Sequence, residues 1–174
     1  MRRAGIALAA AALVSCSSSV RVVRRADPYP FGRGTCKVLV SPLGGALPPT
    51  ERAAFAESYA SAIVPALGSA LGVTSSVAPD ANAFWLQVDV PAWDPGDPVG
   101  GTAHAKVDLR ILDASRATTL DEVEMDLTGK GGGISQRAEQ VGTKAAKAVA
   151  KYVRHRVGCA DYHSSDFGGA YSGE

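Results

Sequence analysis

The sequence lacks the local motifs that mark most enzymes and cofactor-binding proteins. It has no GxGxxG or GxxxxGKS/T loop for phosphates, no HExxH or CxxC pair for zinc, and no GxSxG turn for a nucleophilic serine. The glycine run at residues 129–133 matches neither phosphate motif, so we interpret it as a flexible connection between a strand and a helix. Because no nucleophile, base and oxyanion donor are recognisable together, we predict no catalytic residue and no bound cofactor.

Candidate metal ligands are few and badly spaced. They are His104, His155 and His163, together with the two cysteines outside the leader, Cys36 and Cys159. No two of them have the short spacing typical of a zinc site. We therefore predict no metal site.

The loop at residues 93–98 contains two aspartates, Asp94 and Asp97, around a Pro-Gly pair. Prolines at two positions, and no ligand at every second position, argue against a calcium loop. Asp and Pro-Gly are residues that set chain reversals, so we interpret this loop as a turn.

Neither sign of charge dominates, because 18 Lys and Arg stand against 17 Asp and Glu. This balance argues against a nucleic-acid partner. The charges are nevertheless segregated along the chain. Residues 80–126 contain ten acids and three bases, whereas the helix expected at residues 135–156 contains six bases and one acid. Two interpretations stay open: an ordinary solvated surface, or acidic and basic sides suited to a charged partner or to self-association.

Only one long apolar run is present. Residues 4–14 follow two arginines and end at a small residue before Cys16, which is the order of an export signal. At roughly 1.5 Å per residue, this run covers about half of a ~30 Å hydrocarbon core, so it is too short to span a bilayer. We predict that residues 1–15 are a secretory signal.

The end of this signal, residues 13–16 (Leu-Val-Ser-Cys), resembles the lipobox of bacterial lipoproteins. The resemblance implies that the Cys16 thiol receives a diacylglycerol, that the chain is cut before Cys16, and that the freed amine is acylated, often with palmitate. Ser17 then implies the outer membrane, with the domain facing the periplasm. The alternative is a plain secretory signal followed by an incidental cysteine.

Residues 16–35 are interpreted as a lipidated, flexible tether, because serines, prolines and glycines are frequent there. Its arginines, Arg21, Arg24 and Arg25, could contact anionic head groups, although we favour a solvated linker. After it, residues 36–159 form a single domain, and residues 160–174 form a disordered tail rich in Gly, Ser and Asp.

Cys36 and Cys159 flank the predicted domain, one before its first strand and one after its last helix. An exported chain meets oxidising conditions, so a disulfide between them is expected. Two unrelated thiols are the alternative, because sequence alone does not place their Cα atoms within about 7 Å.

Alternating apolar residues predict strands at residues 37–41, 73–78, 84–90, 104–111 and 122–127. A helix is expected from Glu51, with Thr50 as its N-cap and an end or kink near Val64 because of Pro65. Its core face is predicted to contain Ala56, Tyr59, Ile63, Leu67 and Ala70. The second helix, at residues 135–156, has an apolar stripe and a basic face with Arg137, Lys144, Lys147, Lys151 and Arg154.

The element order β-α-β-β-β-β-α predicts an α/β (α+β) two-layer sandwich. In it, two helices cover one face of a small, mainly antiparallel sheet of about 4–5 strands.

Residues 36–157 also resemble a group of uncharacterised bacterial lipoproteins with an α/β domain like that of the TolB amino terminus and CsgG. The matching segments are the strand at 38–40, the loop at 93–96, residues 100–103 and 107–113, and the glycine run. A departure is Arg116, where the pattern usually has glycine at a hairpin tip that favours a positive φ. The resemblance implies a fold and an envelope location, and it carries no catalytic residues over.

These observations predict a noncatalytic outer-membrane lipoprotein, not an enzyme, that serves as a subunit or accessory factor of an envelope assembly. The lipoprotein LptE, which has a similar element order, is an analogy for such a role. The alternative is a periplasmic module that binds a small ligand or a glycan.

Overall fold

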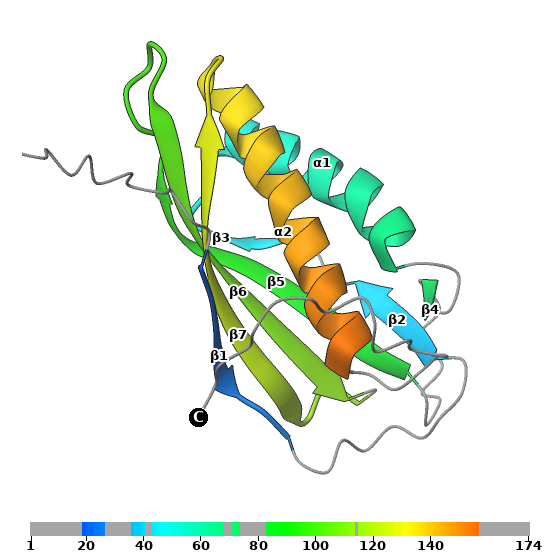
Figure 1. The fold of residues 1–174 in the computed structure, drawn as a ribbon. Coiled ribbons are helices and arrows are strands. Elements are labelled where there is room, and N and C mark those ends of the chain that lie inside the picture. Colours follow the sequence, from blue (N-terminus) through cyan, green and yellow to red (C-terminus); the bar gives the residue numbers. More distant parts are fainter. Residues whose placement is uncertain are drawn as a thin grey trace, which may run out of the picture.

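The computed structural model describes residues 19–26, 36–40, 43–67, 71–73, 83–113 and 115–156 of the chain. Two helices lie on one face of a single twisted sheet (Figure 1). The expected α/β two-layer sandwich is therefore confirmed. The helices are α1 (Pro49–Leu67) and α2 (Ile134–Arg156).

Within the described residues the sheet has seven strands in the order β1-β7-β6-β5-β2-β4, and the short β3 pairs with β5. The strands are β1 (Ser19–Arg24), β2 (Cys36–Val40), β3 (Gly44–Gly45), β4 (Leu71–Val73), β5 (Ala83–Asp94), β6 (Thr102–Asp113) and β7 (Thr119–Lys130). The pairs β7–β6 and β6–β5 are antiparallel, as expected from consecutive alternating strands, and the pair β1–β7 is antiparallel too. The pairs that β2 makes with β4 and β5, and that β3 makes with β5, are parallel, because α1 returns the chain to the same end of the sheet.

The sheet is wider than expected because β1 and β3 were not predicted. The expectation of little structure at residues 17–35 is wrong for Ser19–Arg24, which pairs antiparallel with β7. The valines of this segment alternate with Arg21, and β-branched residues suit a pleated edge strand. The ordered fold therefore begins well before residue 36.

The predicted alternation of the long strands is confirmed by one continuous core. Alternate residues of β5, β6 and β7 contribute side chains to this core, which also contains the buried side chains of both helices: Phe84, Leu86, Val88, Val90, Ala105, Val107, Leu109, Ile111, Val123, Met125 and Leu127. The opposite side chains of these strands point to the open face of the sheet.

Helix α1 differs from its prediction at both ends. It begins at Pro49 and continues through Pro65 to Leu67, so of the expected end or kink near Val64 the end is wrong, and the kink stays a prediction. Pro65 has no backbone N–H and so leaves one helical hydrogen bond unmade, but only two residues of the helix follow it. Leu67 is 1% exposed, and its burial stabilises this last turn. The buried side chains are Phe55, Tyr59, Ile63 and Leu67, so Phe55 takes the core position expected for Ala56. Ala70 lies outside the described residues.

Helix α2 follows its prediction closely, since the stripe Ala138, Val141, Ala145, Val149, Tyr152 and Val153 is buried and Ala148 is partly buried. The two helices approach closely at Gly142. A Cβ atom there would lie 2.2 Å from the Ser58 hydroxyl oxygen and 2.5 Å from the Phe55 carbonyl oxygen. This close contact requires a residue without a side chain.

Candidate functional surfaces

The face of the sheet that the helices leave open carries most of the ionisable groups of β5, β6 and β7. Two ion pairs cross it. Arg110 lies 3.2 Å from Glu122, and Arg21 of β1 lies 2.7 Å from Glu124. Both pairs are substantially exposed, so each contributes little to stability. The predicted wet, acidic face is therefore present, although bases offset part of its charge.

Three carboxylates form one row across this face. The register places Asp89 opposite Asp108, and Asp108 opposite Glu124. Like charges directly opposite one another on neighbouring strands destabilise a sheet. Burial first, and then the charge of Glu124, raise the pKa of Asp108 above its ordinary value. The row therefore destabilises the isolated domain. Proteins keep such unfavourable contacts mainly at functional surfaces.

The exposed face of α2 is basic and points away from the sheet. Lys147, Lys151 and Arg154 are exposed and follow one another at helical spacing, opposite the buried stripe. Lys144 is half-buried, and its amine donates to the Thr128 carbonyl oxygen of β7. The acidic row and this basic helix face thus lie on opposite sides of the sandwich.

Arg137 was expected on this basic face, and that expectation is wrong. Its side chain is fully buried and donates five hydrogen bonds, all to backbone carbonyl oxygens. The acceptors are Pro95, Asp97 and Pro98 of the β5–β6 loop and Gly131 and Gly132 before α2, at 2.7–3.3 Å. The planar guanidinium presents five donors in a fixed geometry, so it fixes two loops against each other. Its role is structural.

The loop at residues 93–98 behaves as a turn, as predicted. The Asp94 carboxylate accepts a hydrogen bond from the Gly96 N–H, and the Asp97 carboxylate accepts one from the Val99 N–H, each at 2.9 Å. These contacts shape the backbone whose carbonyl groups bind Arg137.

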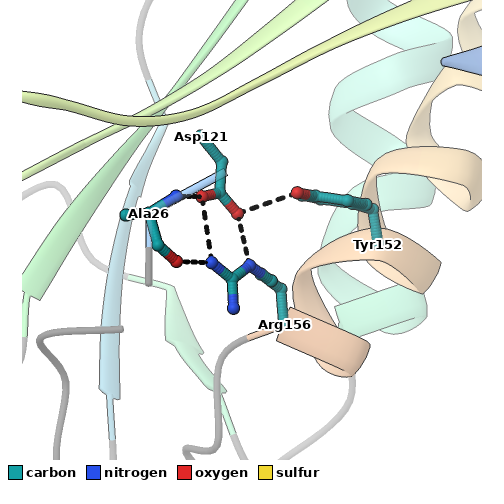
Figure 2. Close-up of polar contacts among 4 residues, drawn as sticks. All are labelled: Ala26, Asp121, Tyr152 and Arg156. Atoms are coloured by element: carbon teal, nitrogen blue, oxygen red, sulfur yellow. Dashed lines mark hydrogen bonds and ion pairs between the residues drawn. The ribbon is translucent and has the colours of Figure 1, made fainter. Parts of the chain in front are cut away.

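A buried polar cluster joins the segment after β1 to the end of α2 (Figure 2). Asp121 is fully buried, and its carboxylate accepts hydrogen bonds from the Tyr152 hydroxyl at 2.8 Å and from the Ala26 N–H at 2.9 Å. The Arg156 guanidinium pairs with the same carboxylate at 2.8 Å and also donates to the Ala26 carbonyl oxygen. Burial, and then the hydrogen bond and charge of Asp121, raise the pKa of Tyr152. The cluster fixes Ala26, and with it β1, to the core.

The tip of the β6–β7 hairpin contains Arg116, which has a φ of 61°. Arg116 therefore adopts the positive φ that the glycine of the family pattern would favour, so its departure from that pattern does not remove this hairpin geometry. The Arg116 guanidinium lies 3.4 Å from the centre of the Trp85 ring, a cation–π contact that favours this strained backbone. Trp85 alternates with the core residues of β5, yet it is only 7% exposed and packs with Leu39 and Leu112 on the open face.

The predicted lipidation and disulfide sites lie largely outside the described residues. This is true of Cys16 and Cys159, while Cys36 is the first residue of β2. The structure contains no disulfide among the residues it describes, so the Cys36–Cys159 bridge stays a prediction.

Of the three histidines, the structure describes two, which lie on different elements. His104 is exposed on β6, His155 is exposed near the end of α2, and His163 lies outside the described residues. Within the described part of the chain, no three His, Cys, Asp or Glu side chains are arranged to hold a metal ion. None of the helices in that part is long and apolar enough to cross a bilayer.

Sequence reasoning placed Arg137 on the surface and did not single out Asp121, although a signal for the burial of each was present. Arg137 precedes Val141 by four residues and so lies on the apolar stripe of α2. Asp121 precedes Val123 by two residues and therefore points to the core side of β7.

No protein-family model matches the sequence, and the search of curated proteins found no match. Solved structures with a similar fold include PelC of Paraburkholderia phytofirmans, which was determined as a dodecamer. PelC is 17% identical to this chain with a TM-score of 0.50, and the match covers 77% of this chain and 98% of PelC. Another is XCC0632 of Xanthomonas campestris, of family DUF330, with 13% identity and a TM-score of 0.50, covering 76% of this chain and 91% of that protein.

A third solved structure is the lipoprotein GNA1162 of Neisseria meningitidis. It has 10% identity and a TM-score of 0.43, and the match covers 68% of this chain and 98% of that protein. This likeness is too low to carry an argument about the chain. At these identities the matches to PelC and XCC0632 show a shared fold and nothing more, while the resemblance to TolB and CsgG stays a prediction.

Proposed function

We propose that this chain is a noncatalytic outer-membrane lipoprotein that associates with further copies of itself as a subunit of an envelope assembly. The observation that carries the proposal is the placement of charge on opposite sides of one sandwich. A carboxylate row occupies the open sheet face, and a basic stripe occupies the outer face of α2.

Opposite charges on opposite faces favour head-to-tail contacts, in which the helix face of one copy meets the sheet face of the next. Such heterologous contacts close into a ring when the rotation between copies permits it. The dodecameric state of PelC shows that a protein of this fold can associate with further copies of itself, which supports the proposal without identifying a shared role.

Lipid attachment is tested by replacing the proposed acceptor. Cys16→Ser should abolish acylation and release the protein from the membrane fraction, because the thiol is the only atom proposed to bear the diacylglycerol. Wild-type protein labelled with radioactive palmitate is the control. A Cys16→Ser product that remains labelled and membrane-bound contradicts the proposal.

Self-association is tested by neutralising the central carboxylate of the row. Asp108→Asn should weaken association about tenfold, equivalent to roughly 1.4 kcal/mol, while it raises the stability of the monomer by about 0.2–1 kcal/mol. Sedimentation velocity of the detergent-solubilised lipoprotein measures the first effect, and urea denaturation measures the second. Glu139→Gln, an exposed acid on α2, is the matched control. Equal association of Asp108→Asn and wild type at low salt contradicts the charge-driven contact.

The same residue sets a pH dependence. Because the folded state raises the pKa of Asp108, its ionised carboxylate destabilises the fold, and this effect disappears as pH falls through the raised value toward the unfolded value of about 3.9. The stability difference between Asp108→Asn and wild type should therefore shrink as pH approaches 4. A difference that is constant from pH 7 to pH 4 contradicts this assignment.

A second candidate, a module that binds a small ligand or glycan, is favoured by two buried donors. Among the described residues, neither the Tyr59 hydroxyl nor the Trp93 indole N–H has a hydrogen-bond partner. Interiors that receive polar ligands contain such groups. Thermal-shift measurements with a panel of oligosaccharides test this function, and a saturable increase in Tm that Tyr59→Phe abolishes would support it.

A further inference from the structure

We infer that β1 is a membrane-contact strand, whose free edge lies on the lipid head groups of the same leaflet that holds the acylated Cys16. The inference rests on the lipidation in the proposed function, and goes beyond it by assigning a second contact surface with a lipid partner. It also means that the domain contacts the bilayer directly, where the sequence had suggested a flexible tether between the two.

The distance along the chain requires β1 to be near the bilayer. Only Ser17 and Ser18 separate Cys16 from Ser19, the first residue of β1. At most about 3.6 Å per residue is available in an extended chain, so the Cα atoms of Cys16 and Ser19 lie within about 11 Å. The head-group region on each side of the hydrocarbon core is roughly 5–8 Å thick. With Cys16 at its inner boundary, β1 begins in this region or directly above it.

The surface of β1 fits such a position. All six of its residues are exposed. Of the five large hydrophobic side chains that are exposed in the described part of the chain, three are in this strand: Val20, Val22 and Val23, at 37%, 41% and 48%. Exposed valines concentrated in one strand favour an apolar or interfacial environment over bulk water.

The charge of the segment also matches a lipid surface. Arg21 pairs with Glu124 but keeps 72% of its side chain exposed, and Arg24 and Arg25 are exposed beside it. Guanidinium groups bind phosphates through paired hydrogen bonds and are attracted to anionic lipids. Valine and arginine together give the segment an apolar and a phosphate-binding component.

The position of β1 in the sheet supplies a third reason. It is the end strand of the sheet, and no other strand of the described residues pairs with its outer backbone edge. An exposed edge is a template for unwanted pairing with other chains, and proteins usually cover or blunt it. The head-group layer covers this edge while its water and phosphate oxygens still satisfy the backbone N–H groups.

The strand cannot move independently of the domain. It pairs with β7 from Ser19 to Arg24, and Ala26 is held by the buried Asp121 and Arg156. Contact through β1 therefore orients the whole domain, with the sheet edge toward the lipid. The acidic row and the basic helix face then both point sideways, where further copies in the same membrane can meet them.

Photocrosslinking of the full-length lipoprotein tests this contact. The photoreactive residue p-benzoylphenylalanine replaces Val22, and in a matched control it replaces Val64, which is 50% exposed on α1. Each acylated protein is reconstituted in vesicles of phosphatidylethanolamine and phosphatidylglycerol, irradiated, and analysed by mass spectrometry for lipid adducts. We expect at least tenfold more adduct at position 22 than at position 64. In phosphatidylcholine vesicles, which lack anionic lipid, the adduct at position 22 should fall severalfold.

The outcomes separate this contact from the lipidation on which it depends. Acylation is read independently from the intact mass of the protein before irradiation. An acylated protein with equal or absent adducts at both positions overturns the contact of β1 and leaves the lipoprotein assignment standing. A protein without acyl chains overturns the lipoprotein assignment, and the contact with it. Circular dichroism identical to wild type excludes misfolding of the substituted proteins as the source of a negative result.

Discussion

Replacement of Arg137 gives the sharpest test of the packing described above. The guanidinium is fully buried, and no carboxylate is among its five hydrogen-bonded acceptors. Its charge is thus compensated by carbonyl dipoles from two loops. Arg137→Met keeps much of the side-chain volume and removes every donor.

The expected loss in the free energy of unfolding depends on the carbonyl oxygens that lose their hydrogen-bond donor in Arg137→Met. An unsatisfied buried carbonyl costs about 1–3 kcal/mol. Asp97, Pro98, Gly131 and Gly132 are exposed residues, so water can reach several of the five oxygens. If one or two oxygens remain unsatisfied, Arg137→Met should lower the free energy of unfolding by about 2–5 kcal/mol. Arg137→Lys should cost less, because its ammonium retains three donors.

Urea denaturation followed by far-UV circular dichroism measures this change. With a typical m-value of about 2 kcal/mol/M, a loss of 3 kcal/mol lowers the midpoint by roughly 1.5 M. Arg154→Met, on the exposed face of the same helix, is the matched control and should change stability by less than about 0.5 kcal/mol. If Arg137→Met is as stable as this control, the structural role assigned to Arg137 is refuted.

Three further substitutions test the core. Gly142→Ala should destabilise the protein by about 1–3 kcal/mol, because its Cβ would overlap the Ser58 hydroxyl, and an unchanged urea midpoint would argue against the close helix contact. Tyr59→Phe should stabilise the protein by about 0.5–1 kcal/mol in the same assay, because it removes a buried hydroxyl that has no hydrogen-bond partner among the described residues. If it instead lowers the free energy of unfolding by more than about 1 kcal/mol, the hydroxyl has a hydrogen-bond partner. Asp121→Asn should lower the free energy of unfolding by about 3–5 kcal/mol, because it leaves Arg156 buried beside a neutral group. Amide hydrogen exchange should also accelerate at residues 19–26, and unchanged exchange there would contradict the anchoring of β1.

The fold class could be predicted because apolar residues recur every second position in the long strands and about every 3.6 residues in α2. In β5, β6 and β7 the alternation of apolar and polar residues assigns each side chain to the core or to the open face, and the structure agrees. The edge strand β1 was missed because its valines lie in a stretch rich in serine, arginine and proline, where composition favours a linker. Its pairing with β7 depends on residues about 100 positions away.

The candidate surfaces were predictable only in part. Segregation of acidic and basic residues was visible along the chain, but the row Asp89–Asp108–Glu124 requires the register of three strands. Charged residues were assigned to the surface because burial of an unpaired charge is costly. Asp121 and Arg137 are exceptions because distant partners compensate them, namely Arg156, Tyr152 and Ala26 for Asp121, and five carbonyl groups for Arg137.

By itself, the sequence determined the local periodicity of this protein, and from that the two-layer sandwich and the core face of its long strands and of its last helix. Period and composition are properties of neighbouring residues, so they can be read without coordinates. The tertiary structure alone decided the parallel half of the sheet, the attachment of β1, and which charges are buried or brought into one row. The pairing and the row depend on contacts between distant segments, and a charge on a core-facing position stays buried only where the fold supplies partners for it, which the spacing of neighbouring residues does not encode.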